Sequence, residues 1–459
     1  MLVDFFRSVA AFVVAIGVLV AFHEFGHFWV ARRFGIKVLR FSVGFAGGAF
    51  KPLWQWRGRD GVEYQIGSIP LGGYVKLLDE REGPVAEAEL PRAFNRQPVG
   101  VRIAVFAAGP AFNFLLAVLF YWALYAAGIP DIKPLLGEPG KATPAAAAGL
   151  HEGDEVVALD QRSIAGWDDL HTAVLAGSLF RDRLGLAVKD RAGTLREVSL
   201  DLRKVRVDPQ YLFEDLGLQP YEPPLSPVLG RIVPGGPADQ AGLKSGDRVL
   251  SIDGNPVVKF QQLHGAFADR GGQVVKLEVQ RGQERVQVSV IPGPLDNGKA
   301  HYVGIGVERQ QIAADEELWH DLQSRQQYGP VTALRVALRK TGDMTVLVVG
   351  FLYRMVLGDI SIKNIGGPIN TAQAAGYSAS IGLSAFLGFV AFVSLNLGIV
   401  NLLPVPLLDG GQILYGLVEL VKGSPLSERA QTFGMQIGLT LLVLLMGLAF
   451  YNDLARLIG

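Results

Sequence analysis

The chain has 459 residues, of which 49% are hydrophobic and only 19% are charged, and its mean hydropathy is +0.28. Soluble domains carry about 25% charged residues, so the composition indicates a membrane protein. The 43 basic and 43 acidic residues balance, and no basic run offers the surface that nucleic-acid binding requires. Because the chain has no cysteine, disulfides and thiolate metal sites are excluded, and any zinc must be held by His, Asp or Glu.

Four apolar stretches are long enough to cross a bilayer, which takes about 17 to 25 helical residues. They cover residues 5–27, 101–127, 381–403 and 433–451. The first stretch does not end in the small-residue cleavage site of a signal peptide but in the polar motif at 23–27. We therefore expect four transmembrane helices surrounded by membrane lipid.

Basic residues crowd the segment that follows the first span. They are Arg32, Arg33, Lys37, Arg40, Lys51, Arg57 and Arg59. The positive-inside rule places this segment in the cytoplasm. Both termini and the long segment between the second and third spans are then expected outside.

The segment at 128–329 is more polar and contains an internal repeat. The pattern P-A-x-x-A-G-L-x-x-G-D starts at Pro144 and again at Pro237, and a strand-like run follows each copy. One copy would be weak evidence, since Gly-Asp turns occur in any β-rich domain, but two copies in register indicate a duplicated small domain. The pattern is similar to that of bacterial PDZ domains, which bind peptides by adding them to a sheet edge. We predict 228–232 as the edge strand of the second copy, and the domains act either in peptide binding or as a size filter.

Two other segments are expected at the membrane surface. The glycine-rich, alternating stretch at 41–78 predicts hairpin strands at 62–66 and 72–77, beside the membrane. The stretch at 331–357 has apolar residues at helical spacing but keeps several charges, which predicts helices lying on the outer membrane surface.

The predicted fold is an α-helical polytopic membrane protein with four transmembrane helices, a membrane-associated β-hairpin region and two inserted PDZ domains of α+β type. The predicted domains are 1–127 with the first two spans and the β region, 128–222 and 223–310 as the PDZ domains, 311–380 as amphipathic surface helices, and 381–459 with the last two spans.

His23, Glu24 and His27 form a His-Glu-x-x-His motif at the end of the first span. Residues four apart on a helix share one face, so both imidazoles reach one metal ion while Glu24 lies beside it as a base. Ionisable residues in an apolar span cost several kcal/mol unless they are paired or ligated, so this cluster indicates function. The structural alternative is a helix end with interfacial histidines.

A catalytic zinc site has three protein ligands and one open position, so a third ligand is needed. No other histidine lies in or beside a span, and Asp409 follows directly after the third span. The first and third spans run in the same direction, so both motifs reach the same cytoplasmic depth. We predict His23, His27 and Asp409 as the zinc ligands; a turn or capping aspartate is the alternative for Asp409.

The predicted reaction is metal-assisted hydrolysis of a peptide bond, in which Glu24 takes the proton of water and passes it to the leaving amine. Since the peptide groups of a helix are already hydrogen-bonded, such a protease must hold its substrate extended. Asn401 is a candidate for bonding the substrate backbone, and the hairpin at Gly44 is a candidate strand edge. An interhelical hydrogen bond is the alternative for Asn401 and the favoured interpretation for Asn113.

Five motifs in order resemble the site-2 protease family, in its RseP-type branch that regulates sigma-E in Gram-negative bacteria. They are HEFGHFWVARRFG, IPLGGYVKLLDE, AAGPAFNFLLA, the two PDZ-like copies and NLGIVNLLPVPLLDGG. The resemblance implies an intramembrane zinc metalloprotease of the inner membrane, with periplasmic PDZ domains and the predicted zinc site near the cytoplasmic side. It also implies that Asn401, Pro404 and Pro406 handle the substrate.

The substrates that the resemblance implies are single-span membrane proteins cut within their membrane segment. One class is an anti-sigma factor already trimmed by a periplasmic protease, and the other is remnant signal peptides. Two positions depart from the family pattern: Ala46 follows Gly44-Phe45 where relatives have glycine, and Gln412 stands where many have histidine. Ala46 weakens the prediction of a strand edge at Gly44, whereas Gln412 should cause no loss of zinc.

Two other functions are compatible with parts of the sequence. A catalytically inactive membrane scaffold with peptide-binding PDZ domains would have no use for the intact base Glu24. A zinc transporter would need several polar spans that form a path, and only one metal cluster is predicted.

Overall fold

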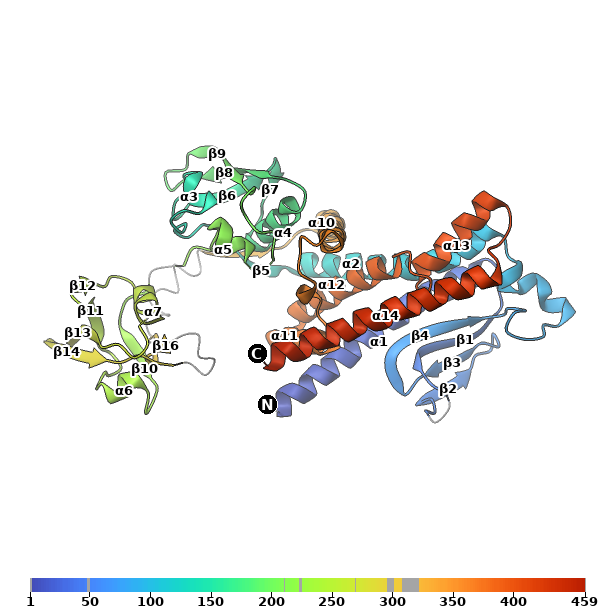
Figure 1. Cartoon of the computed structure of the whole chain (residues 1–459), viewed down its shortest axis with the longest axis horizontal. Coiled ribbons are helices and arrows are strands. Elements are labelled where there is room, and N and C mark those ends of the chain that lie inside the picture. Colours follow the sequence, from blue (N-terminus) through green and yellow to red (C-terminus); the bar gives the residue numbers. More distant parts are fainter. Residues whose placement is uncertain are drawn as a thin grey trace.

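The computed structural model describes residues 2–47, 50–209, 211–222, 225–268, 270–294, 301–307 and 322–458. It has a bundle of long helices with a small sheet at one end, and two β-rich units near the other end (Figure 1). The predicted domain boundaries at residue 223 and at 310–311 lie outside the described residues.

Among the described residues, four helices are long and apolar enough to cross a membrane, as predicted. They are α1 (Leu2–Arg33), α2 (Val99–Ala127), α12 (Leu383–Asn401) and α14 (Glu428–Ile458). α12 ends before Pro404 and Pro406, which lack the amide donors that would continue a helix. The expectation that the His-Glu-x-x-His motif ends its helix is wrong, because α1 continues to Arg33 and buries Phe28 and Ala31 against the small sheet.

α1 and α2 pack closely at the level of the histidine motif, and glycines allow this approach. A Cβ atom on Gly26 would lie 2.5 Å from the carbonyl oxygen of Ala108, and one on Gly109 would lie 2.3 Å from His27 Nε2. Small residues at helix contacts are typical of membrane bundles, where close backbone packing replaces the hydrophobic effect. The sequence thus brings α2 directly against the face of α1 that carries the motif.

The small sheet contains β1 (Val38–Phe45), β2 (Trp54–Arg57), β3 (Glu63–Ile66) and β4 (Ile69–Leu77), in the order β2-β3-β1-β4. β3 forms a hairpin with β2, but β3 and β4 do not pair with each other as hairpin strands. β1 lies between them, parallel to β3 and antiparallel to β4. The chain crosses the end of β1 at Gly67, where a Cβ atom would lie 2.4 Å from the carbonyl oxygen of Phe45.

The two copies of the repeat have the same element order and the same strand order. The first has α3 (Pro144–Ala147), β6 (Glu155–Leu159), β7 (Arg162–Ser163), α4 (Trp167–Ser178), β8 (Arg183–Lys189) and β9 (Leu195–Asp201). The second has α6 (Pro237–Gln240), β11 (Arg248–Ile252), β12 (Asn255–Pro256), α7 (Gln261–Ala268), β13 (Val275–Arg281) and β14 (Glu284–Val290). β10 (Leu229–Ile232), at the predicted edge strand, pairs with β17 (Ile305–Val307) in a two-stranded sheet. Sequence repetition therefore corresponds to structural repetition.

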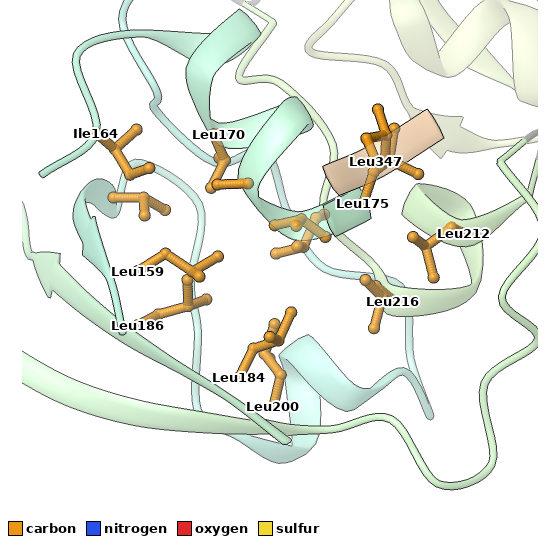
Figure 2. Packing of buried hydrophobic residues seen from close by; sticks show 14 of the residues in the cluster. Leu159, Ile164, Leu170, Leu175, Leu184, Leu186, Leu200, Leu212, Leu216 and Leu347 are labelled. Carbon is orange, nitrogen blue, oxygen red and sulfur yellow. The ribbon is translucent and has the colours of Figure 1, made fainter. Parts of the chain in front are cut away.

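The first repeat shares its core with α10 (Pro330–Leu357), which lies in the segment predicted as surface helices. Leu347 of α10 packs among leucines of α4 and α5 (Leu212–Leu216), as Figure 2 shows. Lys340 adds an ion pair of 2.7 Å to Asp168 at the start of α4. Further apolar side chains of α10 remain exposed, including Val331, Leu338, Val349, Tyr353 and Val356. α10 thus joins the first repeat and leaves apolar side chains free to contact lipid.

The remaining elements connect these parts. They are the short helices η1 (Glu87–Arg92), η2 (Phe94–Arg96) and η3 (Ile362–Asn364), α11 (Pro368–Ile381) before α12, α13 (Asp409–Lys422) after it, β5 (Ile129–Ile132) paired with β18 (Gln323–Gln326), and β15 (Gly293–Pro294) paired with β16 (His301–Tyr302).

Candidate metal and catalytic site

The three predicted zinc ligands meet at one point between α1 and the start of α13. Asp409 Oδ2 lies 3.2 Å from His23 Nε2 and 3.6 Å from His27 Nε2. The two Nε2 atoms are 3.2 Å apart. The site is closed in, since His23 is 8% exposed and the side chain of Asp409 16% exposed. Residues far apart in the sequence therefore form one compact cluster of donor atoms.

The spacing of these donor atoms fits zinc. Bonds of about 2.0–2.1 Å in a tetrahedron place ligand atoms about 3.3 Å from one another, close to the separations observed here. Imidazole nitrogen and carboxylate oxygen are both common zinc donors, and three of them leave the fourth position open. His23, His27 and Asp409 would hold the ion in this arrangement.

The backbone of α2 fixes the protonation of His27. Nδ1 of His27 lies 2.7 Å from the carbonyl oxygen of Val105, which can only accept a hydrogen bond. The ring proton of neutral His27 therefore sits on Nδ1, and the lone pair of Nε2 faces Asp409. This is the orientation that a metal-binding histidine needs.

Asn113 of α2 makes the corresponding contact with His23. Its side chain is fully buried, and its amide lies 3.1 Å from Nδ1 of His23. The backbone carbonyl of Asn113 accepts a hydrogen bond of 2.8 Å from Ser394 of α12. The interhelical hydrogen bond expected for Asn113 thus has a predicted zinc ligand as its partner.

Asp409 is positioned by the tight turn between α12 and α13. It is the first residue of α13, and Cβ atoms on Gly410 and Gly411 would lie 2.3 and 2.2 Å from the carbonyl oxygens of Leu402 and Val405. The Asp-Gly-Gly sequence is required here because only glycine allows this approach. Gln412, the departure from the family pattern, donates a 2.8 Å hydrogen bond to the carbonyl oxygen of Pro406. Gln412 thus holds the loop that precedes Asp409.

Glu24 is buried beside the cluster and faces β4. A Cβ atom on Gly73 of β4 would lie 3.0 Å from Cγ of Glu24. β4 is the last strand of its sheet, so its outer edge has no paired strand among the described residues. A free strand edge therefore lies close to the predicted base.

The strand edge expected at Gly44 is not there. β1 is paired on both sides, and Gly44 has a positive φ of 84°, with Ile69 O only 2.8 Å from the position of a Cβ atom. Gly44 is therefore a residue of close backbone contact, and β4 provides the open edge instead. Among the other predicted substrate residues, Asn401 ends α12, and Pro404 and Pro406 lie in the loop that leads to Asp409.

The model of the family described as Peptidase family M50 matches residues 11–445. The chain belongs to peptidase family M50. It is 39% identical to the regulator of sigma-E protease RseP of Escherichia coli K12, over 99% of this chain and 100% of that one. It is 41% identical to a putative zinc metalloprotease of Xylella fastidiosa 9a5c, over 98% of this chain and 99% of that one. A solved PDZ domain of the SdrC-like protein of Listeria monocytogenes covers 20% of this chain at 20% identity, with a TM-score of 0.17, too low to decide the fold of either repeat.

Membership of M50 confirms several expectations from the sequence. The chain is an intramembrane zinc metalloprotease, which agrees with its four apolar helices and with relatives named as zinc metalloproteases. Its four apolar helices, taken with its RseP relatives, indicate an inner-membrane protein. The resemblance to the site-2 proteases is confirmed as well.

Three features of the candidate site were not predicted from the sequence. They are the contact of Asn113 with His23, the packing of Gly109 against both imidazoles, and the free edge of β4. Gly109 and Asn113 lie four residues apart and so share a helix face, which was the available signal. Nothing in the sequence indicated that this face meets the histidines.

Proposed function

We propose that this M50 peptidase cuts single-span membrane proteins within their membrane segment, with zinc held by His23, His27 and Asp409 and with Glu24 as the base. The observation that carries the proposal is the convergence of the three donor atoms within 3.6 Å, two of them on the apolar helix α1 and the third at the start of α13. Buried ionisable groups at such a depth are costly and therefore indicate function. When bound, zinc acts as a Lewis acid that polarises a peptide carbonyl and lowers the pKa of water.

Glu24 performs the proton transfers in this proposal. Its carboxylate takes the proton of the attacking water and then gives it to the nitrogen of the leaving amine. Glu24 is 8% exposed, so the surrounding helices and β4 keep bulk solvent from the proton during the transfer. The carboxylate returns to its charged form when the amine leaves.

The substrate is held in an extended form along β4. A transmembrane helix satisfies its own backbone hydrogen bonds, so the segment to be cut must unwind before the base can reach it. The outer edge of β4 offers free N–H and C=O groups that replace the lost hydrogen bonds. Gly73 leaves this strand without a side chain where it faces Glu24. Asn401 at the end of α12 and Pro404 and Pro406 in the loop that leads to Asp409 are the further substrate contacts in this proposal.

The active site lies near the cytoplasmic side, with the small sheet associated with the membrane and both repeats acting as PDZ domains in the periplasm. Trp54 and Trp56 of β2 are 57% and 41% exposed, with ring centroids 4.2 Å apart, and exposed tryptophans are enriched at membrane interfaces. Basic residues around this sheet support its placement on the cytoplasmic side of the membrane. The shared element order of the repeats supports two copies of one domain.

The substrates are a trimmed anti-sigma factor and remnant signal peptides. The names of the relatives, regulators of sigma-E protease, support the first class. The repeats then bind the cut end of a substrate or exclude bulky proteins from the membrane unit.

The decisive experiment compares the wild type with Glu24→Gln in proteoliposomes that contain a model single-span substrate. Wild-type protein cuts the substrate within the membrane segment, and Glu24→Gln keeps zinc but loses cleavage, because the amide cannot accept the proton. Unchanged cleavage by Glu24→Gln would refute the mechanism. If wild-type protein left the substrate uncut but moved zinc across the proteoliposome membrane, the protein would instead be a zinc transporter.

A further inference from the structure

α2 touches both predicted zinc histidines along one face. Val105, Gly109 and Asn113 are spaced four residues apart, so these positions lie above one another on one face of the helix. Gly109 packs against both rings, Val105 accepts from His27, and Asn113 contacts His23. The same helix face therefore reaches Nδ1 of each imidazole, the ring nitrogen that points away from Asp409.

The protonation of His23 depends on which atom of Asn113 faces it. A neutral imidazole carries one ring proton, and only the other nitrogen has a lone pair for a metal. If the Nδ2 group of Asn113 donates to Nδ1 of His23, the ring proton must sit on Nε2, the atom that faces Asp409. If Oδ1 faces His23 instead, Nδ1 carries the proton and Nε2 is free to bind zinc.

The two orientations of the amide have the same shape, so hydrogen bonds must decide between them. Nδ2 lies 3.1 Å from His23 Nδ1 as placed, and Oδ1 of Asn113 is buried without a hydrogen-bond partner in the described part of the chain. Turning the amide by half a rotation exchanges the two atoms and leaves one polar atom unpaired either way. His23 therefore decides the orientation, because only Oδ1 facing Nδ1 leaves its Nε2 lone pair beside Asp409 and His27.

We propose that Asn113 is a positioning residue whose carboxamide oxygen accepts the Nδ1 proton of His23 and thereby keeps Nε2 available to zinc. This inference rests on the proposed zinc site. The position of Asn113 is fixed by its complete burial and by the bond from Ser394 to its backbone carbonyl. α2 then sets both imidazoles, His27 through a backbone carbonyl and His23 through a side chain. Removal of a hydrogen-bond partner of this kind typically lowers metal affinity by about 10–100-fold.

The test measures zinc affinity of the purified full-length protein in detergent, by competition with a coloured chelator. Asn113→Leu keeps the volume but removes the acceptor, and Asn113→Asp keeps an acceptor oxygen and cannot donate when ionised. We expect zinc affinity to fall about 10–100-fold in Asn113→Leu and to be largely recovered in Asn113→Asp. Asn113→Ala removes the acceptor without adding bulk and gives the same loss if Asn113→Leu does not fold.

A second readout reports the geometry of the site without activity. The visible spectrum of the cobalt-loaded protein should change in Asn113→Leu and should resemble wild type in Asn113→Asp. Asn396→Leu on α12 makes the same substitution where the amide donates to the carbonyl oxygen of Phe392 in its own helix, so it is the matched control and keeps wild-type affinity.

Each outcome separates the role of Asn113 from the zinc site itself. Wild-type zinc affinity in both Asn113→Leu and Asn113→Ala would overturn the proposal. An equal loss of affinity in Asn113→Asp and Asn113→Leu would overturn it as well, because the amide of Asn113 would then either donate to His23 or serve only in packing. Unchanged affinity in His23→Ala would overturn the zinc site on which the proposal rests.

Discussion

Arg102 of α2 and Glu419 of α13 form an ion pair of 2.6 Å between the two helices. Both side chains are largely buried, 20% and 15% exposed. The pair ties the helix that starts with Asp409 to the helix that carries Gly109 and Asn113. Two parts of the site from distant sequence positions are thus held together away from the donor atoms.

Glu419→Gln should therefore destabilise the fold and weaken zinc binding together. The hydrogen bond to a charged group is worth about 1.5–3 kcal/mol, and Arg102 would lose its ionised partner. Thermal unfolding in detergent and zinc competition measure both effects. Arg203→Met, which removes an exposed ion pair with Asp201 in the first repeat, is the control and should change neither. Loss of stability with unchanged zinc affinity would show that α13 does not need this pair to place Asp409.

Gly109→Ala should displace the imidazoles and abolish zinc binding and cleavage. The added Cβ atom would lie 2.3 Å from His27 Nε2 and 2.7 Å from His23 Cε1, so the rings or α2 must move. Gly100→Ala on the same helix is a matched control, since no atom lies within 4 Å of its Cβ position. Alanine is the better helix former by up to about 1 kcal/mol, so Gly100→Ala should be neutral or stabilising. Zinc content of the two purified variants checks the prediction, and a full complement in Gly109→Ala would contradict it.

The sequence predicted those parts of the site that depend on the spacing of residues within one helix or on the direction in which a span runs. The four-residue spacing of His23 and His27 places both on one face, and the shared direction of two spans brings Asp409 to the same depth. The role of α2 depends on how that helix is rotated about its axis, and its uniformly apolar sequence does not specify this. Asn113 was therefore assigned an ordinary interhelical bond.

The small sheet shows a different limit of the sequence. Consecutive strands usually pair as hairpins, and the strands at 62–66 and 72–77 fit that expectation. The insertion of β1 between β3 and β4 follows from close backbone contacts at Gly44 and Gly67, which become visible only in three dimensions. The pairing of β1 on both sides also explains why the free edge beside Glu24 belongs to β4 and not to β1.

Asp247→Asn should destabilise the second repeat at neutral pH and lose this effect in acid. Burial alone would raise the pKa of Asp247, but Arg281 at 2.7 Å and the N–H of Lys244 hold it below its usual value. The pKa of an aspartate in the unfolded chain is about 3.9. A carboxyl group whose pKa is lower in the folded protein stabilises the fold at pH values above about 3.9, and this stabilisation is lost as the pH falls through the folded pKa. Hydrogen exchange of β13 in the full chain, at pH values from neutral to 3, measures the change. A difference from wild type that stays constant over this range would contradict the prediction.

Lys340 and Asp168 should respond unequally to mutation, because they are unequally buried. The side chain of Lys340 is 10% exposed and also bonds Thr172 at 3.0 Å, whereas that of Asp168 is 61% exposed. Asp168→Ala leaves a buried ammonium group without its counter-charge and should weaken the docking of the first repeat on α10 by about 1–3 kcal/mol. Lys340→Met fills the same space with an apolar chain and leaves Asp168 hydrated, so it should be close to neutral. Hydrogen exchange of α4 in the full-length protein compares the two variants, and an equal effect of both would show that the charge of Lys340 does not need Asp168.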